Sequence, residues 1–167
     1  MRIISGKASR VILTAPNLPD LRPTTDRIKE SVFASLEPIV GERVVDLFSG
    51  SGSLGLEALS RGAESVHMIE KNPRLCRAIH ENLARVQKSM GDTETVAEVV
   101  RGDALRAPAL LSHVSPTLIL ADPPYEPEKG DKNTRVLLCD TGFQAWAADA
   151  RLVLELSSRS RLLDDPE

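Results

Sequence analysis

The sequence predicts an α/β fold built on a mostly parallel sheet, and three observations support this prediction. From Arg43 onward, short apolar runs alternate with helix-length segments, as in sheets whose strands are joined by helical crossovers. A glycine-rich stretch follows the first of these runs, as in nucleotide-binding α/β folds. The 167 residues are 41% hydrophobic and 27% charged, which suits one soluble domain over residues 1–167.

The first part of the chain predicts a hairpin, a linker and a helix. Apolar runs at 2–4 and 10–14 flank a turn at Gly6, which predicts a β-hairpin. Prolines at 16, 19 and 23 predict an extended linker, so we separate a basic hairpin and linker (1–23) from the core region (24–167). Thr24, Thr25 and Asp26 offer N-cap side chains for a helix that runs to Pro38.

The core region alternates strands with helices. Strands are predicted at 44–48, 65–70, 98–101, 117–121 and 151–156, and helices at 54–61, from Pro73 through Val86, at 104–111 and at 134–148. Asn72 would cap the helix that Pro73 begins, and Gly62 would end the helix before the second strand. Right-handed crossovers then give a parallel sheet.

Charge is unevenly distributed along the sequence. The net charge of −3 argues against indiscriminate nucleic-acid binding. Residues 1–31, however, hold six Lys or Arg against three acids, whereas the rest holds 15 against 21. A basic N-terminus on an acidic body favours a local phosphate-contact patch, and chance clustering on a solvated surface is the alternative.

Other features of the sequence argue against several classes of protein. No apolar run approaches the length of a membrane span, and no secretory signal opens the chain. Cys76 and Cys139 lie far apart without metal-like spacing, and His67, His80 and His113 form no catalytic pattern. We therefore expect a reduced, cytoplasmic, monomeric protein with no metal site and no membrane partner.

The glycine stretch is a candidate cofactor loop. Gly50, Gly52 and Gly55 follow the spacing of a dinucleotide-binding loop, and Phe48 precedes them. The glycines alone do not separate a dinucleotide from S-adenosylmethionine. Asp46 does so, because a carboxylate at the end of the strand repels a pyrophosphate but favours the ammonium and sulfonium of S-adenosylmethionine. We assign Asp46, Phe48 and the three glycines to cofactor binding.

Two further acids follow the next strands. Glu70 ends the second predicted strand and would accept hydrogen bonds from a ribose diol, with a helix-capping or surface role as the alternative. Asp103 follows the third strand, where the adenine amine would lie, and it is equally suited to cap the next helix.

The segment from Asp122 to Tyr125, Asp-Pro-Pro-Tyr, is a candidate catalytic clamp for an exocyclic amine. The Asp122 carboxylate and the Pro123 carbonyl would accept from both amine hydrogens, which exposes the nitrogen lone pair for attack on a methyl group. Tyr125 would stack on the base. Positioning then does most of the catalysis, and Asp122 stabilises the cation that develops on nitrogen. A turn after a strand, with Tyr125 as a packing aromatic, is the structural alternative.

Together these motifs resemble the RsmD family over nearly the whole chain. The resemblance rests on residues 2–7, on Arg22-Pro-Thr-Thr-Asp-Arg-Ile-Lys-Glu-Ser-Val-Phe33, on the glycine loop, on 101–104 and on the Asp122 segment. It implies a class I, S-adenosylmethionine-dependent methyltransferase that modifies the N2 amine of one guanosine in small-subunit ribosomal RNA. It also implies that Thr24 and Thr25 lie over the cofactor, and that Lys7, Arg10, Arg22 and Arg27 contact RNA.

The C-terminal sequence departs from that pattern. A full class I sheet has an antiparallel strand pair after its fifth strand, and residues 157–167 hold too few apolar residues to form it. We therefore expect a sheet without this pair, either truncated or closed differently. Two other functions stay open: adenine-N6 methylation of RNA or DNA, and RNA binding or ribosome assembly without catalysis.

Overall fold

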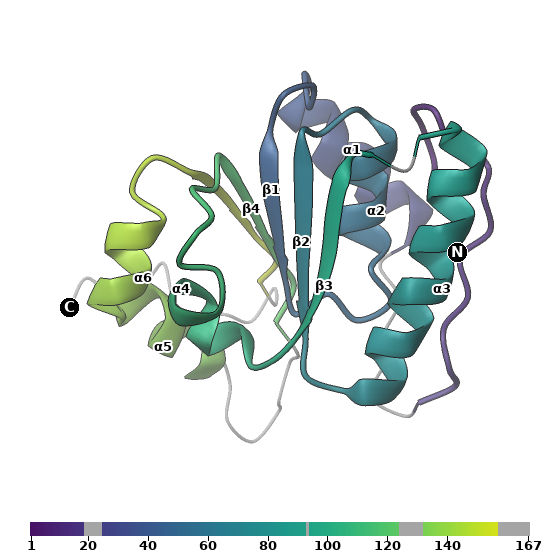
Figure 1. The fold of residues 1–167 in the computed structure, drawn as a ribbon. Helices are drawn as coiled ribbons and strands as arrows, with labels where there is room; N and C mark the ends of the chain where they lie inside the picture. Colours follow the sequence, from purple (N-terminus) through teal and green to yellow (C-terminus); the bar gives the residue numbers. More distant parts are fainter. Residues whose placement is uncertain (19–24, 93, 124–131, 157–167) are drawn as a thin grey trace.

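A parallel sheet between two layers of helices forms the centre of the computed structural model (Figure 1), which describes residues 1–18, 25–92, 94–123 and 132–156. The strands lie in the order β3-β2-β1-β4-β5, and each neighbouring pair is parallel. Their bounds are β1 (Arg43–Leu47), β2 (Ser65–Glu70), β3 (Val96–Arg101), β4 (Leu118–Ala121) and β5 (Arg151–Leu154). The predicted α/β fold is confirmed.

Alternate strand residues face the two helical layers. Val44, Val66 and Met68 pack against one layer, formed by α1 (Asp26–Leu36), α2 (Ser53–Ser60) and α3 (Pro73–Met90). Val45 and Ile69 pack against the other, formed by the 3₁₀ turn η1 (Ala104–Arg106), α4 (Ala107–Leu110), α5 (Lys132–Cys139) and α6 (Thr141–Trp146). Burial of the central strands β1, β2 and β4 on both faces explains their mostly apolar sequences.

Predicted N-caps begin two of the helices. Asn72 accepts a hydrogen bond from the Arg74 amide at the start of α3, and Gly91 ends that helix in a left-handed conformation. Thr25 caps α1 by accepting from the Ile28 amide. None of the described helices is long and apolar enough to cross a bilayer.

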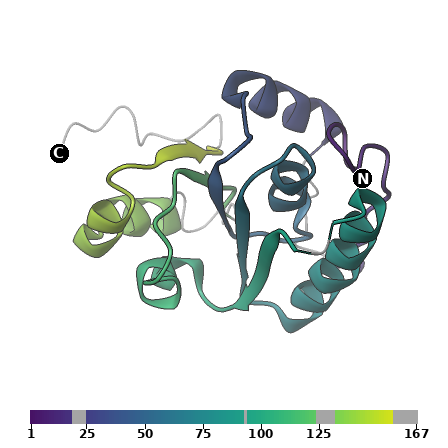
Figure 2. The same cartoon turned by 45° about the horizontal axis from the view of Figure 1, so that its top comes forward.

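The N-terminal segment, residues 1–18, reverses direction as predicted, but its only regular pairing is one antiparallel bridge between Arg2 and Ile12. The physical reason is that several of its amides bind α2. The amides of Ile4 and Ser5 donate to the Glu57 carboxylate, and that of Lys7 donates to the Ser60 carbonyl. Figures 1 and 2 show the segment running alongside α3.

The helix predicted over 134–148 is two helices. Asp140 separates α5 from α6, because its side chain accepts from the Phe143 amide and caps α6. An Asp that bonds to the backbone ahead of it favours a new helix start over continuation of the old helix.

Candidate active site

The candidate site lies at the centre of the sheet, where the order in which strands are added reverses. β1 pairs with β2 on one side and with β4 on the other, so the chain winds both ways from β1. Ligands of open α/β sheets bind at the carboxyl ends of the strands at such a point. Asp46 from β1, Glu70 from β2 and Asp122 after β4 all lie at these ends.

The glycine loop leaves β1 through three residues with positive φ. Phe48 (φ 59°), Gly50 (φ 55°) and Gly52 (φ 77°) turn the chain into α2. The prediction that Phe48 continues the strand was wrong: β1 ends at Leu47, because a left-handed residue cannot extend a ladder. A Cβ on Gly52 would lie 3.0 Å from Ile79 Cγ2, so the loop packs tightly on α3.

Gly55 lets α2 approach the sheet. A Cβ there would lie 2.8 Å from Met68 Cγ and 3.1 Å from Asp46 Oδ2. Its amide donates to Asp46 Oδ2 at 2.9 Å, which ties the first turn of α2 to β1. The third glycine of the motif thus serves close helix–strand packing.

Asp46 is a buried acid with an unusual ionisation. It is 1% exposed, and burial, opposed by the Gly55 hydrogen bond, raises its pKa to about 7. The negative charges of Asp122 and Glu70 raise that pKa further, so the three acids lie close enough to interact. A cation bound here would favour the ionised form of Asp46.

Glu70 holds the glycine loop in place. Its Oε2 accepts from the Gly50 amide at 2.9 Å, and its Oε1 accepts from the Asn72 amide at 2.7 Å. The structural role that we weighed for this residue is therefore present. Each carboxylate oxygen keeps a second lone pair, so a ribose diol remains compatible with these contacts.

Asp103 and Thr25 both act as helix caps. Asp103 accepts from the Leu105 amide at 3.1 Å and is exposed at the carboxyl end of β3. Thr25 accepts from Ile28 at 3.3 Å and is exposed at the start of α1. Capping uses one side-chain oxygen, and Asp103 has a second that is not used for the cap.

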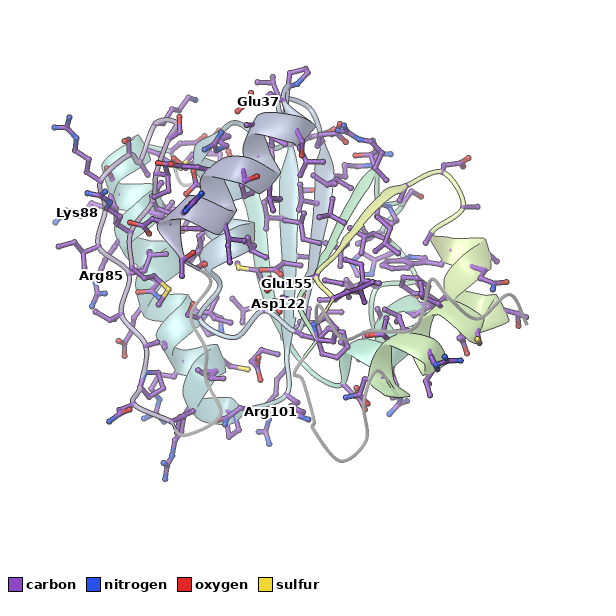
Figure 3. The ribbon with its side chains drawn as sticks, turned by 180° about the vertical axis from the view of Figure 1, so that it is seen from behind. Glu37, Arg85, Lys88, Arg101, Asp122 and Glu155 are labelled. Atoms are coloured by element: carbon purple, nitrogen blue, oxygen red, sulfur yellow. The ribbon has the colours of Figure 1, made fainter. Side chains whose placement is uncertain are left out.

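A mostly apolar pocket of about 230 Å³ lies beside Asp122, between α1 and the ends of β4 and β5. Its lining residues are Ile28 and Val32 from α1, Leu54 from α2, Leu120, Ala121 and Asp122, and Val153, Leu154 and Glu155. Asp122 and Glu155 lie next to each other at this point (Figure 3). Glu155 was not predicted as a site residue, since nothing in the sequence of residues 151–156 distinguishes this acid from one on a solvated surface.

The predicted RNA-contacting residues divide into two places. Arg27 is exposed next to Ile28, which lines the pocket. Lys7 and Arg10 are exposed near the last turn of α2, since Lys7 donates to the Ser60 carbonyl. The eight residues of α2 span about 12 Å between that turn and the glycine loop. Thr24, Arg22 and Tyr125 lie outside the described residues, whereas Pro123 is half-buried beside Asp122.

A buried ion pair fixes α1 over the pocket. The side chains of Lys29 and Glu57 are fully buried with their charged atoms 3.7 Å apart. Lys29 also donates to the Arg2 carbonyl, and burial lowers its pKa. No local pattern predicts this pair, because the partners are 28 residues apart on different helices.

Known proteins resemble this chain over most of its length. The family described as Conserved hypothetical protein 95 matches residues 1–167. The Ribosomal RNA small subunit methyltransferase D of Escherichia coli K12 is 36% identical over 155 residues, which covers 92% of this chain and 72% of that protein. The protein of the same name from Haemophilus influenzae is 31% identical over 168 residues, covering 100% of this chain and 83% of the relative.

The chain belongs to the RsmD family. The fold agrees, since the solved structure named "Putative methyltransferase yhhF from Escherichia coli" superimposes with a TM-score of 0.64 at 33% identity. That match covers 83% of this chain and 72% of the other. This RsmD-family chain therefore has the class I methyltransferase fold, and its acids lie at the switch point of that fold.

Proposed function

We propose that the chain transfers a methyl group from S-adenosylmethionine to the exocyclic N2 of a guanosine in small-subunit ribosomal RNA. One observation carries this proposal: Asp46 and Asp122 interact across the switch point, one beside the glycine loop and the other beside an apolar pocket. A donor site and an acceptor site would then meet between β1 and β4. The names of the relatives, which specify small-subunit ribosomal RNA, support the substrate.

On the donor side, the charges favour a cationic ligand. Asp46, Glu70 and Asp122 place negative potential where a pyrophosphate would be repelled. The ammonium and sulfonium of S-adenosylmethionine would be attracted there, and the sulfonium makes its methyl group open to attack. Glu70 would bind the ribose and Asp103 the adenine amine, while Phe48 and the glycines form the wall.

On the acceptor side, the pocket suits a flat base. Its walls are largely aliphatic, and Asp122 supplies a carboxylate at the edge. Asp122 and the Pro123 carbonyl would accept from the two amine hydrogens, and Tyr125 would stack on the ring. A bound S-adenosylmethionine would supply the methyl group, and these acceptors would aim the nitrogen lone pair at the methyl carbon, opposite the carbon–sulfur bond that would break. The nitrogen afterwards loses a proton.

RNA would approach over the start of α1. Arg27 is next to Ile28, which lines the pocket, and would contact the phosphates next to the target, while Thr25 lies at the start of the same helix. The family resemblance assigns Thr24 to the cofactor and Arg22 to the RNA. Lys7 and Arg10, beyond α2, would contact more distant phosphates. The described residues form one domain without a separate module to extrude a base, so a base already exposed in folded RNA is the substrate we favour. Such a substrate places the enzyme in the cytoplasm.

Labelled methyl transfer tests the proposal. Unmodified small ribosomal subunits, naked ribosomal RNA and duplex DNA are incubated with S-adenosylmethionine labelled in its methyl group, and the modified base is identified by mass spectrometry. N2-methylguanine in ribosomal RNA supports the proposal, and its loss in Asp122→Ala assigns the catalysis. Label on adenine or in DNA would identify an adenine methyltransferase. RNA binding without label, unchanged in Asp122→Ala, would identify a non-catalytic binder.

A further inference from the structure

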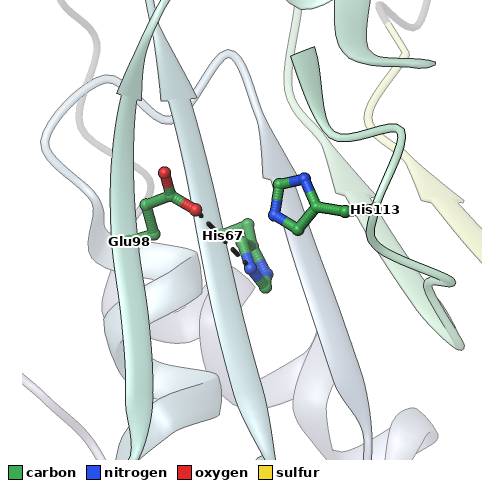
Figure 4. A group of neighbouring side chains, drawn as sticks. All are labelled: His67, Glu98 and His113. Atoms are coloured by element: carbon green, nitrogen blue, oxygen red, sulfur yellow. Dashed lines mark ion pairs between the residues drawn. The ribbon is translucent and has the colours of Figure 1, made fainter. Parts of the chain in front are cut away.

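Two histidines and a glutamate converge on the sheet away from the candidate active site (Figure 4). His67 lies in the middle of β2, and Glu98 is its neighbour in β3. His113 comes from the turn between α4 and β4. His67 precedes Glu70 by three residues, about 10 Å along the strand, so the group does not overlap the proposed methyl-transfer site.

The separations fit a shared cation better than direct hydrogen bonds. One nitrogen or oxygen from each residue lies within 4.8 Å of the other two. His67 Nε2 and Glu98 Oε2 are 3.7 Å apart, which is too long for a hydrogen bond. Two ligands at about 2.0–2.1 Å from a tetrahedral metal ion lie roughly 3.4 Å apart, so small rotations of Glu98 and His113 would complete the geometry.

His67 is poorly explained as an ordinary core residue. It is 5% exposed, and its Nδ1 is buried with no hydrogen-bond partner among the described residues. Its ring meets that of His113 edge-on at a centroid distance of 6.2 Å. The His67 atom that faces the Glu98 carboxylate is Nε2, so a cation shared with Glu98 would be bound through Nε2 while Nδ1 carries the proton.

We propose that His67, Glu98 and His113 bind a divalent transition-metal ion of the zinc class. Two imidazoles and one carboxylate favour zinc over magnesium or calcium, which prefer oxygen ligands. Glu98 and His113 are exposed, so the fourth position is open to water. The ion links β2 and β3 to the turn that leads into β4, and its role is to stabilise this side of the sheet.

Calorimetric titration tests the site with zinc chloride as the probe. Tag-free, chelator-treated protein is expected to bind one zinc ion, and cobalt chloride is expected to give the visible absorption of a tetrahedral site. Glu98→Gln and His113→Ala should each weaken binding at least tenfold, in line with the loss of a ligand. His80→Ala is the matched control, because His80 is an exposed histidine of α3 outside the group.

Thermal unfolding provides a second measurement. At a zinc concentration 100 times the dissociation constant, the melting temperature should rise by about 5–10 °C in the wild type and His80→Ala, and by much less in the two ligand variants. Glu98 and His113 are exposed, so both variants should keep the wild-type circular dichroism spectrum. No zinc binding by the wild type, or equal binding by wild type and both ligand variants, would overturn the proposal.

Discussion

Two clusters of buried charge involve α2, and they differ in whether opposite charges compensate the buried acid. At the structural cluster, the Glu57 carboxylate accepts from the Ile4 and Ser5 amides and from Arg61, and it lies 3.7 Å from the Lys29 ammonium. At the acidic cluster, Asp46 and Glu70 accept from backbone amides. Among the described residues, neither forms an ion pair with Lys or Arg.

The difference shows how burial can serve stability in one place and binding in another. Glu57 is compensated by opposite charges within the fold, so the structural cluster needs no ligand. Asp46 is buried and has like charges nearby, and its raised pKa reflects the free-energy cost of ionising it there. No opposite charge within the fold offsets that cost among the described residues. A cationic ligand would recover it. The four predictions below test this contrast, in order of decreasing effect.

The largest effect is expected at the structural cluster. Glu57→Ala leaves the Lys29 ammonium and two N-terminal amides without their acceptor, so we expect a loss of about 3–5 kcal/mol in the free energy of unfolding. Urea unfolding followed by circular dichroism measures it. Glu64→Ala is the control, since its pair with Arg43 is exposed and should contribute less than about 1 kcal/mol. Equal losses in the two variants would contradict the contrast.

The next effect concerns catalysis. Asp122→Asn removes the charge that would stabilise the cation on the attacked nitrogen, so methyl transfer should fall about 10²–10³-fold while the cofactor still binds. Single-turnover transfer and a cofactor titration separate the two quantities. Glu155→Gln changes the neighbouring acid of the same pocket and should stay within about tenfold of the wild type. A greater loss in Glu155→Gln than in Asp122→Asn would exchange their roles.

A smaller effect of opposite sign is expected at Asp46. Its pKa is raised in the folded state, so the contribution of Asp46 lowers the free energy of unfolding of the wild type as pH rises from about 4 to about 7, by up to about 4 kcal/mol. Asp46→Asn avoids this loss but must accommodate an amide. If that accommodation costs about 2 kcal/mol, we expect the variant to be about 2 kcal/mol more stable than the wild type at pH 8 and about 2 kcal/mol less stable near pH 4.

Thermal unfolding across this pH range measures the Asp46 effect. Asp103→Asn is the control, because Asn caps a helix as well as Asp and the change should be small at every pH. The stabilised Asp46→Asn variant should bind S-adenosylmethionine more weakly. A variant that is less stable than the wild type at pH 8 would show that Asp46 is already compensated within the fold.

The smallest effect separates the two groups of basic residues. Arg27 is next to Ile28, which lines the pocket, so Arg27→Gln should lower kcat/KM on small subunits about fivefold. It should also reduce the slope of log binding constant against log salt concentration by about one. Lys7→Gln, at the far end of α2, should change kcat/KM by less than about twofold. The reverse order would place the RNA along the N-terminal segment instead.

Features determined by neighbouring residues could be predicted from the sequence. Asn72 begins its helix as local capping chemistry requires, and the glycine loop follows its strand. The missed features depend on residues far apart in the chain: the burial of Lys29 against Glu57 and the proximity of Glu155 to Asp122. No local pattern encodes such contacts, because they arise only when the sheet is assembled.

The attachment of the N-terminal segment also has a consequence for the timing of synthesis. Ile3, Ala8 and Leu13 are buried against helices, and Thr14 bonds to Asn82, which is 68 residues later. At roughly 5–20 residues per second, a ribosome needs about 3 to 14 seconds to make the intervening chain. For that interval the first residues made expose apolar side chains with no surface to cover them, so the start of this protein is among the last parts to fold.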